Sequence, residues 1–268
     1  MTIIMYHSIG AAVDPYTLSP SAFRRQIECI ANTYRVVHLG DVRKASATRD
    51  TSAVVITFDD AFVDFCEAAL PVLAEFSMPC TLFVPTGCLG GWNTWDDGLP
   101  GIARKRVMTA GDLRAARATG LVDLGSHTVD HPRMSRLSRR QMHTQALTSK
   151  RFLEDLFDVP IDMFSYPYGQ RDDFSPLTSQ VLAEVGYDVA VTTCWGTRTA
   201  SSNLLTLPRV SLAEQDTAPV IRRKIDGHYN WIGIKETLGY AWRSRFGTLH
   251  SGGDEDTWTQ RARPSRGN

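Results

Sequence analysis

The sequence predicts an α/β protein built from repeated strand–helix units, and three observations support this fold class. Short apolar runs typical of buried strands alternate with amphipathic helical segments about seven or eight times. The run Ala53–Ile56 is apolar throughout, as expected of a parallel strand that is buried on both faces. The length of 268 residues suits one large domain of this class. We therefore expect a parallel sheet, either closed into a barrel or doubly wound.

The individual elements follow from apolar runs, helical spacing and capping residues. The expected strands are 2–7, 34–39, 53–58, 80–84, 121–125, 163–166, 187–193 and 204–210. The expected helices are 20–31, 41–47, 61–76, 109–118, 138–157, 175–185, 217–226 and 234–245. Ser19, Thr109 and Ser138 are the expected helix caps.

The chain is expected to form a single domain over residues 1–250, followed by a flexible polar tail over 251–268. The insertion 86–106 is long for a loop in a compact domain, which indicates a functional or mobile segment. The two C-terminal helices carry more apolar residues than an exposed end needs. They are expected to close the base of the barrel, with a homodimer contact as the alternative.

Composition excludes several function classes. The net charge is zero, so no broad electrostatic footprint for nucleic acid is visible. No apolar run approaches the roughly 18 residues that a membrane span needs. The chain begins directly with a strand and has no basic leader, which predicts a cytoplasmic protein.

The segment 126–132 carries two histidines, His127 and His131, at a spacing of four residues. On a single helical turn this spacing puts both imidazoles on one side, where they can share one metal ion. Asp59 and Asp60 end a predicted strand and offer a third ligand. The alternatives are that Asp60 caps a helix and that the histidines bond to backbone carbonyls.

A carboxylate beside a metal ligand suits hydrolysis. With Asp60 on the metal, Asp59 can take the proton of an activated water. His7 ends the first predicted strand and lies on the same rim. It can deliver a proton to a leaving group, or it can be a buried, hydrogen-bonded rim residue, and position alone leaves both open.

Three segments together resemble the polysaccharide deacetylase family, also called the NodB-homology domain or carbohydrate esterase family 4. They are TFDD at 57–60, SHTVDHP at 126–132 and FSYPYG at 164–169, and the resemblance extends over about 2–210. It implies a distorted (β/α)7 barrel and one divalent metal ion, with zinc expected and cobalt, nickel or manganese as alternatives.

The resemblance also implies roles for single residues. Asp59 corresponds to the general base, and Asp60, His127 and His131 to the metal ligands. In the third segment, Pro167 and Tyr168 line the site, and the Tyr168 N–H corresponds to the donor to the oxyanion.

Two features depart from the family pattern. The third motif usually has an arginine where this chain has Ser165, and Arg209 is a candidate replacement that also lies on the substrate side. The C-terminal Leu-x-Ile-His motif, which usually supplies the general acid, is missing. The N-terminal Tyr6-His7 instead resembles the branch that deacetylates poly-N-acetylglucosamine, which implies that His7 is the general acid.

The predicted substrate is an acetamido-bearing amino sugar, glycoside or glycosylated metabolite. Trp95 and Asp96 in the insertion can stack on a sugar face and bond its hydroxyls, although the tryptophan can equally pin the loop. Trp195 is a candidate floor of the sugar pocket or a core residue. Two other functions stay open: hydrolysis of a different, non-sugar C–N amide, and sugar binding by a pseudoenzyme.

Overall fold

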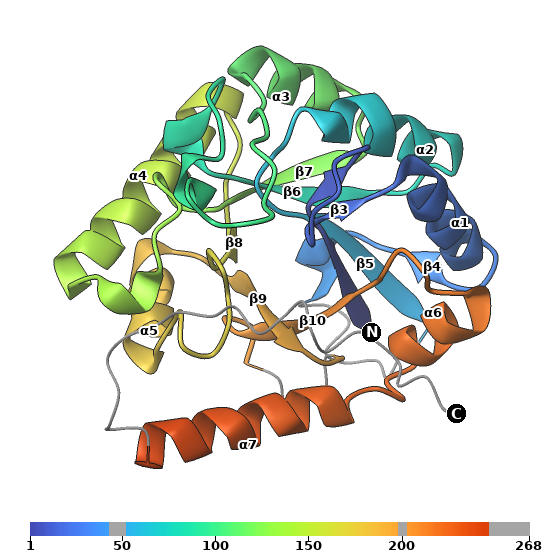
Figure 1. The fold of residues 1–268 in the computed structure, drawn as a ribbon. Coiled ribbons are helices and arrows are strands. Elements are labelled where there is room, and N and C mark those ends of the chain that lie inside the picture. The colour runs from blue at the N-terminus through green and yellow to red at the C-terminus, as the bar shows by residue number, and fades with distance from the viewer. Residues whose placement is uncertain (43–51, 198–202, 247–268) are drawn as a thin grey trace.

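The computed structural model describes residues 1–42, 52–197 and 203–246. Seven of the described strands form a closed parallel ring, in which β1 pairs with both β5 and β10 (Figure 1). They are β1 Thr2–Tyr6, β5 Ala53–Phe58, β6 Cys80–Val84, β7 Val122–Ser126, β8 Met163–Ser165, β9 Val189–Trp195 and β10 Leu207–Ser211. The ring is the distorted (β/α)7 barrel that the sequence predicts.

Helices surround the ring (Figure 1). They are α1 Pro20–Ala31, α2 Leu70–Glu75, α3 Ala110–Ala118, α4 Arg139–Phe157, α5 Pro176–Val185, α6 Ala218–Ile225 and α7 Trp231–Phe246. Three begin at the predicted caps, because the side chains of Ser19, Thr109 and Ser138 each accept a hydrogen bond from a backbone N–H in the first turn. Short strands lie beside the barrel: β4 Arg35–Val36 pairs with β5, and β2 Ser8–Ile9 pairs with β3 Thr17–Leu18.

The core has two layers because successive strand residues point to opposite faces. Ile3 and Val55 belong to the cluster that fills the barrel, together with Phe83. Their neighbours Ile4 and Ile56 belong to the larger cluster between strands and helices. Strands buried on both faces therefore read as continuous apolar runs.

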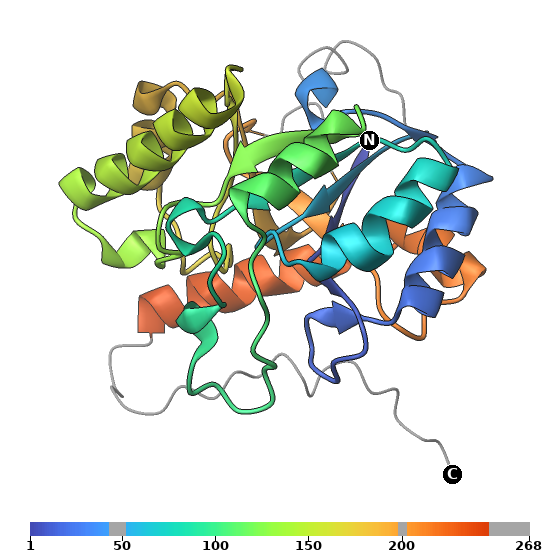
Figure 2. The same ribbon diagram turned by 90° about the horizontal axis from the view of Figure 1, so that it is seen from above.

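All strands of the ring run in the same direction, so their carboxyl ends meet at one end of the barrel. The insertion 86–106 and the β2–β3 segment project from this region (Figure 2). The insertion contains two short 3-10 helices, Thr86–Cys88 and Thr94–Asp96. One isolated antiparallel bridge, Trp92–Arg106, lies within the insertion, and a second joins Val107 at its end to Phe62, which follows β5.

The structure corrects two predicted elements. The helix expected over 61–76 begins late, as a π-helix at Phe65–Ala69 followed by α2. The preceding residues are held in the bridge to the insertion, and Pro71 cannot donate a helical hydrogen bond. The strand expected over 34–39 shortens to β4, followed by a 3-10 turn at 39–42. The helix expected over 41–47 falls mostly outside the described residues, as does the tail 251–268.

The last helix, α7, lies against the side of the barrel at β9 rather than across its base (Figure 1). Gly233 comes so close to the Trp195 carbonyl that a Cβ there would lie 2.1 Å from its oxygen. Closure of the base is therefore not the role of this helix, and the homodimer contact stays a prediction. Of the described helices, none has the length and apolar content needed to cross a bilayer. The single-domain boundary and the cytoplasmic location also stay predictions.

Candidate metal centre

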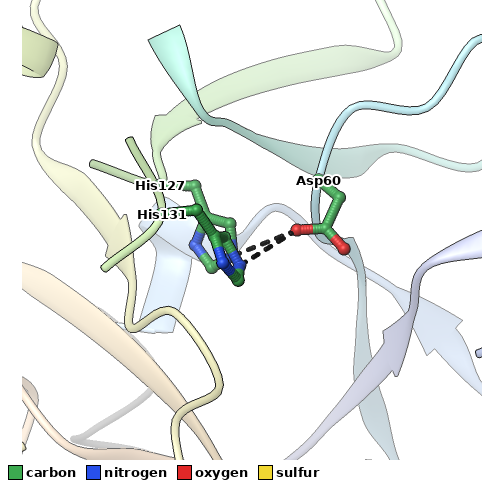
Figure 3. Close-up of side chains that lie close together, drawn as sticks. All are labelled: Asp60, His127 and His131. Atoms are coloured by element: carbon green, nitrogen blue, oxygen red, sulfur yellow. Dashed lines mark hydrogen bonds and ion pairs between the residues drawn. The ribbon is translucent and has the colours of Figure 1, made fainter. Parts of the chain in front are cut away.

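Asp60, His127 and His131 form one buried group at the carboxyl end of the barrel. Both imidazoles point toward the carboxylate (Figure 3). The Nε2 atoms lie 3.1 Å apart, and each is 3.3–3.4 Å from Asp60 Oδ1. Ligand atoms at about 2.0–2.2 Å from a tetrahedral zinc ion are about 3.3–3.6 Å apart. The two distances to Asp60 Oδ1 match this separation and the Nε2–Nε2 distance is slightly shorter, so the group has roughly the dimensions of a site for one metal ion.

The bonding of these atoms also fits a cation. His127 Nδ1 lies 2.8 Å from the Ser165 carbonyl, so Nδ1 carries the hydrogen and Nε2 keeps its lone pair. Asp60 Oδ1 is buried without a hydrogen-bond partner. Burial opposes ionisation of Asp60, but the two imidazoles outweigh it and hold the pKa of its carboxyl well below the usual value. The group therefore presents unpaired acceptors, which is what a metal ion requires.

The backbone around the group is strained. Positive φ angles occur at Asp60 (70°), Ala61 (49°), Thr128 (66°), His131 (56°) and Tyr168 (59°), all of them in or next to the three sequence motifs. Non-glycine residues adopt such angles at a cost, mainly where surrounding packing imposes them at functional sites. The helical turn expected over the histidines is wrong, because this segment is irregular and left-handed residues bring the two rings together.

Asp59 lies beside the metal group and is paired with Arg209. Arg209 Nη1 donates to Asp59 Oδ1 at 2.8 Å, and Nη2 donates to Oδ2 at 2.6 Å. Burial opposes ionisation of Asp59, but Arg209 outweighs it and lowers the pKa of the carboxyl. Arg209, the candidate replacement for the arginine of the third motif, therefore pairs with Asp59. Arg209 has a fully buried side chain and lies behind Asp59, so it offers substrate no surface.

Arg209 has two further partners that were not predicted from the sequence. Its Nη2 lies 3.2 Å from Ser165 Oγ, and its Nη1 donates to Thr57 Oγ1 at 3.1 Å. Ser165 occupies the motif position where an arginine was expected, and its small side chain contacts the guanidinium that arrives from β10. Because Ser165 stands where the motif usually has an arginine, the sequence already offered a signal that it contacts an arginine from elsewhere in the chain.

His7 follows β1 and approaches Asp59 from the other side. Its Nε2 lies 3.8 Å from Asp59 Oδ2, and its side chain is 18% exposed, so solvent or substrate can reach it. Burial lowers the pKa of His7, while the carboxylates of Asp59 and Asp60 raise it in part. The ring of Tyr16 lies 5.5 Å from the His7 ring, another neighbour that the sequence analysis missed.

The sequence matches the polysaccharide deacetylase family over residues 46–190. The chain belongs to the polysaccharide deacetylase family. It is 25% identical over 245 residues to a poly-β-1,6-N-acetyl-D-glucosamine N-deacetylase of Staphylococcus aureus, a match that covers 87% of this chain and 78% of the relative.

Two solved structures share the fold. One is the Streptococcus pyogenes deacetylase PplD in complex with acetate, with a TM-score of 0.70, 23% identity and coverage of 84% of this chain and 97% of the other. The other is IcaB from Ammonifex degensii, with a TM-score of 0.68, 20% identity and the same coverage. Both likenesses support the closed barrel.

In this member of the family, aromatic rings enclose the metal group. Trp95 stacks on His131 with ring centroids 4.5 Å apart, and Tyr168 meets His131 edge-on at 4.9 Å. The Tyr168 hydroxyl donates to the Trp95 carbonyl at 3.3 Å. Phe62, which the sequence analysis did not single out, stacks behind Trp95. Trp95 thus forms a wall of the site, and its stacking also fixes the orientation of the His131 imidazole.

The insertion is held by buried polar contacts. Lys105 Nζ lies 2.5 Å from Asp14 Oδ2, and both side chains are almost fully buried. Asn93 donates to Asp96 Oδ2 at 3.0 Å. Burial raises the pKa of Asp96 to about 6, and the nearby Asp60 adds to this rise. Asp96 therefore changes charge within the physiological range.

The structure does not bring Trp195 to the metal group. Its ring lies on the outer face of the barrel, where Lys224 of α6 is 5.6 Å from the ring centroid. Its backbone N–H donates to Glu236 of α7 at 3.1 Å. Pro167, in contrast, is buried next to Tyr168 in the loop beside the metal group. A floor for the sugar at Trp195 finds no support in these contacts.

Proposed function

We propose that this protein is a metal-dependent hydrolase that removes the N-acetyl group from an amino sugar. The observation that carries the proposal is the buried ligand group with the carboxylate of Asp59 beside it. A binding protein would need the ligands at most, whereas a carboxylate kept ionised next to them suits a general base. Membership of the deacetylase family supports the same chemistry.

Asp60, His127 and His131 are the proposed ligands. A divalent metal held there supplies Lewis-acid polarisation and acidifies water. Zinc is the first candidate because two imidazoles and one carboxylate leave a position open, as in catalytic zinc sites. Cobalt, nickel and manganese are the alternatives.

The other steps belong to the side chains around the ligands. Asp59 takes a proton from the attacking water, and Arg209 keeps its carboxylate charged and oriented. The Tyr168 N–H donates to the developing oxyanion. His7 protonates the departing amine, since an amide anion is a very poor leaving group. Because burial lowers the pKa of His7, it needs a proton source, and Asp59 is the nearest one at 3.8 Å.

The proposed substrate is a sugar with an acetamido group. Trp95 and Asp96 lie on the insertion at the metal group, where an aromatic face and a carboxylate suit a sugar ring and its hydroxyls. The name of the Staphylococcus aureus relative makes a β-1,6-linked N-acetylglucosamine polymer the first substrate to test. Small acetamido glycosides and glycosylated metabolites remain in the same proposed class.

Acetate release from a panel of substrates tests the proposal. The panel contains β-1,6-linked N-acetylglucosamine oligomers, monomeric acetamido glycosides, and formyl and cyclic amides without sugar. Each is assayed with metal-stripped protein and with protein reloaded with zinc, cobalt, nickel or manganese, and Asp59→Asn is the matched inactive control. Metal-dependent acetate release from the sugars is the expected result.

Two outcomes contradict it. Turnover of only the non-sugar amides would indicate a different C–N hydrolase. Stoichiometric metal and sugar binding with no acetate release would indicate a pseudoenzyme.

A further inference from the structure

A cavity of about 380 Å³ lies outside the barrel, between the outer face of β9 and β10 and the helix α7. The loop after β8 contributes Arg171 to its wall, β9 contributes Trp195, and α7 contributes Ile234. None of its lining residues belongs to the metal group or to the Asp59–Arg209 pair. The cavity is therefore separate from the proposed catalytic site, and a ligand bound in it would not depend on deacetylase activity.

Two buried hydrogen-bond donors line this cavity without a partner. They are Arg171 Nε and Trp195 Nε1. A buried donor left unsatisfied costs about 1–3 kcal/mol, so native structures normally supply an acceptor. Two such donors from different segments on one cavity indicate a common acceptor between them.

The neighbouring polar groups do not fill this role. Glu236 is close enough to affect Arg171 electrostatically, but its Oε2 accepts the Trp195 backbone N–H at 3.1 Å. Burial raises the pKa of Glu236. Across the described ranges, Arg171 forms no ion pair within 4 Å. Among the described residues, the guanidinium of Arg171 on this cavity therefore has no directly paired counter-ion.

Three of the hydroxyl groups on the wall already have partners, and one of them, Thr197 Oγ1, accepts from Asn230 Nδ2 at 2.8 Å. Thr192 Oγ1 donates to the Leu207 carbonyl at 3.1 Å, and Thr237 Oγ1 donates to the Gly233 carbonyl at 2.7 Å. The rest of the lining includes apolar side chains, among them Phe174 and Ile234. The ligand that fits such a wall has one oxygen-rich, negatively charged end and an apolar remainder.

We propose that this cavity is a binding site for a small aliphatic carboxylate, whose oxygens accept hydrogen bonds from Arg171 Nε and Trp195 Nε1. A carboxylate matches one guanidinium and one further N–H, and its alkyl part matches the apolar wall. A phosphate dianion would need more donors than the two that are unsatisfied. A neutral sugar would leave the charge of Arg171 without a counter-ion.

The wall of the site is fixed by bonds to the catalytic end of the barrel. Arg209 Nε donates to the Thr192 carbonyl at 2.8 Å, and Thr193 Oγ1 donates to the Tyr168 carbonyl at 2.6 Å. The strand that carries Trp195 therefore cannot move freely to cover its indole N–H. A preformed wall of this kind favours binding because little ordering is needed.

Nuclear magnetic resonance of the indole N–H groups tests the proposal directly. Sodium butanoate is titrated into ¹⁵N-labelled protein, and the signal of Trp195 is assigned from its loss in Trp195→Phe. We expect a saturable shift of this signal with a dissociation constant of about 1 mM or lower. The indole signal of Trp95 reports on the metal centre in the same spectrum, so binding there is distinguished from binding in the cavity.

Variants and a neutral probe decide which chemistry is recognised. Arg171→Met is expected to weaken butanoate binding at least tenfold, whereas Arg151→Met, at an exposed position on α4, is expected to leave it unchanged. Butanamide, which has the same shape without the charge, is expected to bind at least tenfold more weakly. A Trp195 signal that does not saturate, an equal response to butanamide, or unchanged affinity in Arg171→Met would each overturn the proposal.

Discussion

The metal group and the cavity beside α7 both contain buried polar atoms without partners, but of opposite kinds. At the metal group the unpaired atom next to the two Nε2 atoms is an acceptor, Asp60 Oδ1, whereas His131 Nδ1, which also has no partner, is not one of the converging atoms. In the cavity the unpaired atoms are donors, Arg171 Nε and Trp195 Nε1. Since each set needs its complement, the first site suits a cation and the second an anion.

The two sites also differ in how the chain builds them. The metal group comes from loops at the strand ends, where left-handed residues such as Thr128 and His131 aim the side chains. The cavity comes from the packing of α7 on β9, with Gly233 against the Trp195 carbonyl. The residues of the metal group therefore lie in short sequence motifs on strained loops. The residues of the cavity come from separate segments that helix packing brings together, so no short motif identifies them.

The largest expected effect comes from removing an acceptor of the metal group. Asp60→Asn replaces a charged ligand by a neutral amide of the same shape, so metal binding is lost. Turnover is expected to fall by about a thousandfold or more, which corresponds to several kcal/mol of lost charge stabilisation. Metal content and kcat measure this. Asp123→Asn is the control, because that carboxylate pairs with His38 instead. Full activity in Asp60→Asn would remove Asp60 from the ligand set.

The next largest effect separates the chemistry from the metal. Asp59→Asn and His7→Ala are each expected to lower kcat by about a hundredfold or more, because each removes a proton-transfer group. The metal should remain bound in both variants, since neither residue belongs to the ligand group. Metal analysis beside steady-state kinetics checks this. A variant that keeps both its metal and its full rate would exclude that residue from the mechanism.

Loss of Arg209 is expected to reduce both rate and stability. Arg209→Met leaves the Asp59 carboxylate buried without its partner, which costs about 3–5 kcal/mol of folding free energy. As a positioning residue, it should affect kcat by about ten- to a hundredfold with little change in KM. Urea unfolding and steady-state kinetics measure the two effects.

Arg209→Lys is the matched variant, because it restores the charge without the two-pronged contact. It should recover part of both losses. A stability loss with unchanged kcat in Arg209→Met would show that Arg209 is structural only.

The smallest expected effect is a pH dependence of substrate binding. The pKa of Asp96 is raised to about 6, so its carboxyl is neutral below this pH and charged above it. If the charged form bonds the sugar hydroxyls, KM should fall a few-fold as pH rises through about 6. Asp96→Asn should remove this pH dependence and keep KM nearly constant across the same pH range. If the fall in KM near pH 6 persists in Asp96→Asn, it arises from the titration of another side chain.

The sequence predicted the repeating units well, for a local reason. Whether a strand is buried on both faces is visible in its own apolar run, as at Ala53–Ile56, and helix starts are visible at Ser19 and Thr109. The candidate ligand group could be predicted because Asp60, His127 and His131 lie in short motifs at strand ends. The family resemblance supplied the closed ring, which the alternation alone had left open.

Other features depended on contacts between distant segments. The helical turn at the histidines was expected from spacing alone, but packing around His131 imposes a left-handed backbone instead. The helix expected over 61–76 begins late because Phe62 bridges to Val107, directly after the insertion. The sequence left Trp195 open between a floor of the sugar pocket and a core residue, and its position next to α7 depends on a helix that packs from the far end of the chain.

The sequence by itself determined most of the strands, the helix caps and the candidate metal ligands, because each depends on a short stretch of chain. Only the tertiary structure decided that Arg209 pairs with Asp59, 150 residues away, and that Arg171 and Trp195 face one cavity. The closure of the barrel brings β10 beside β1 and so carries Arg209 to the strand end of β5. Such pairings are set by the geometry of the whole ring, which no local pattern of residues contains.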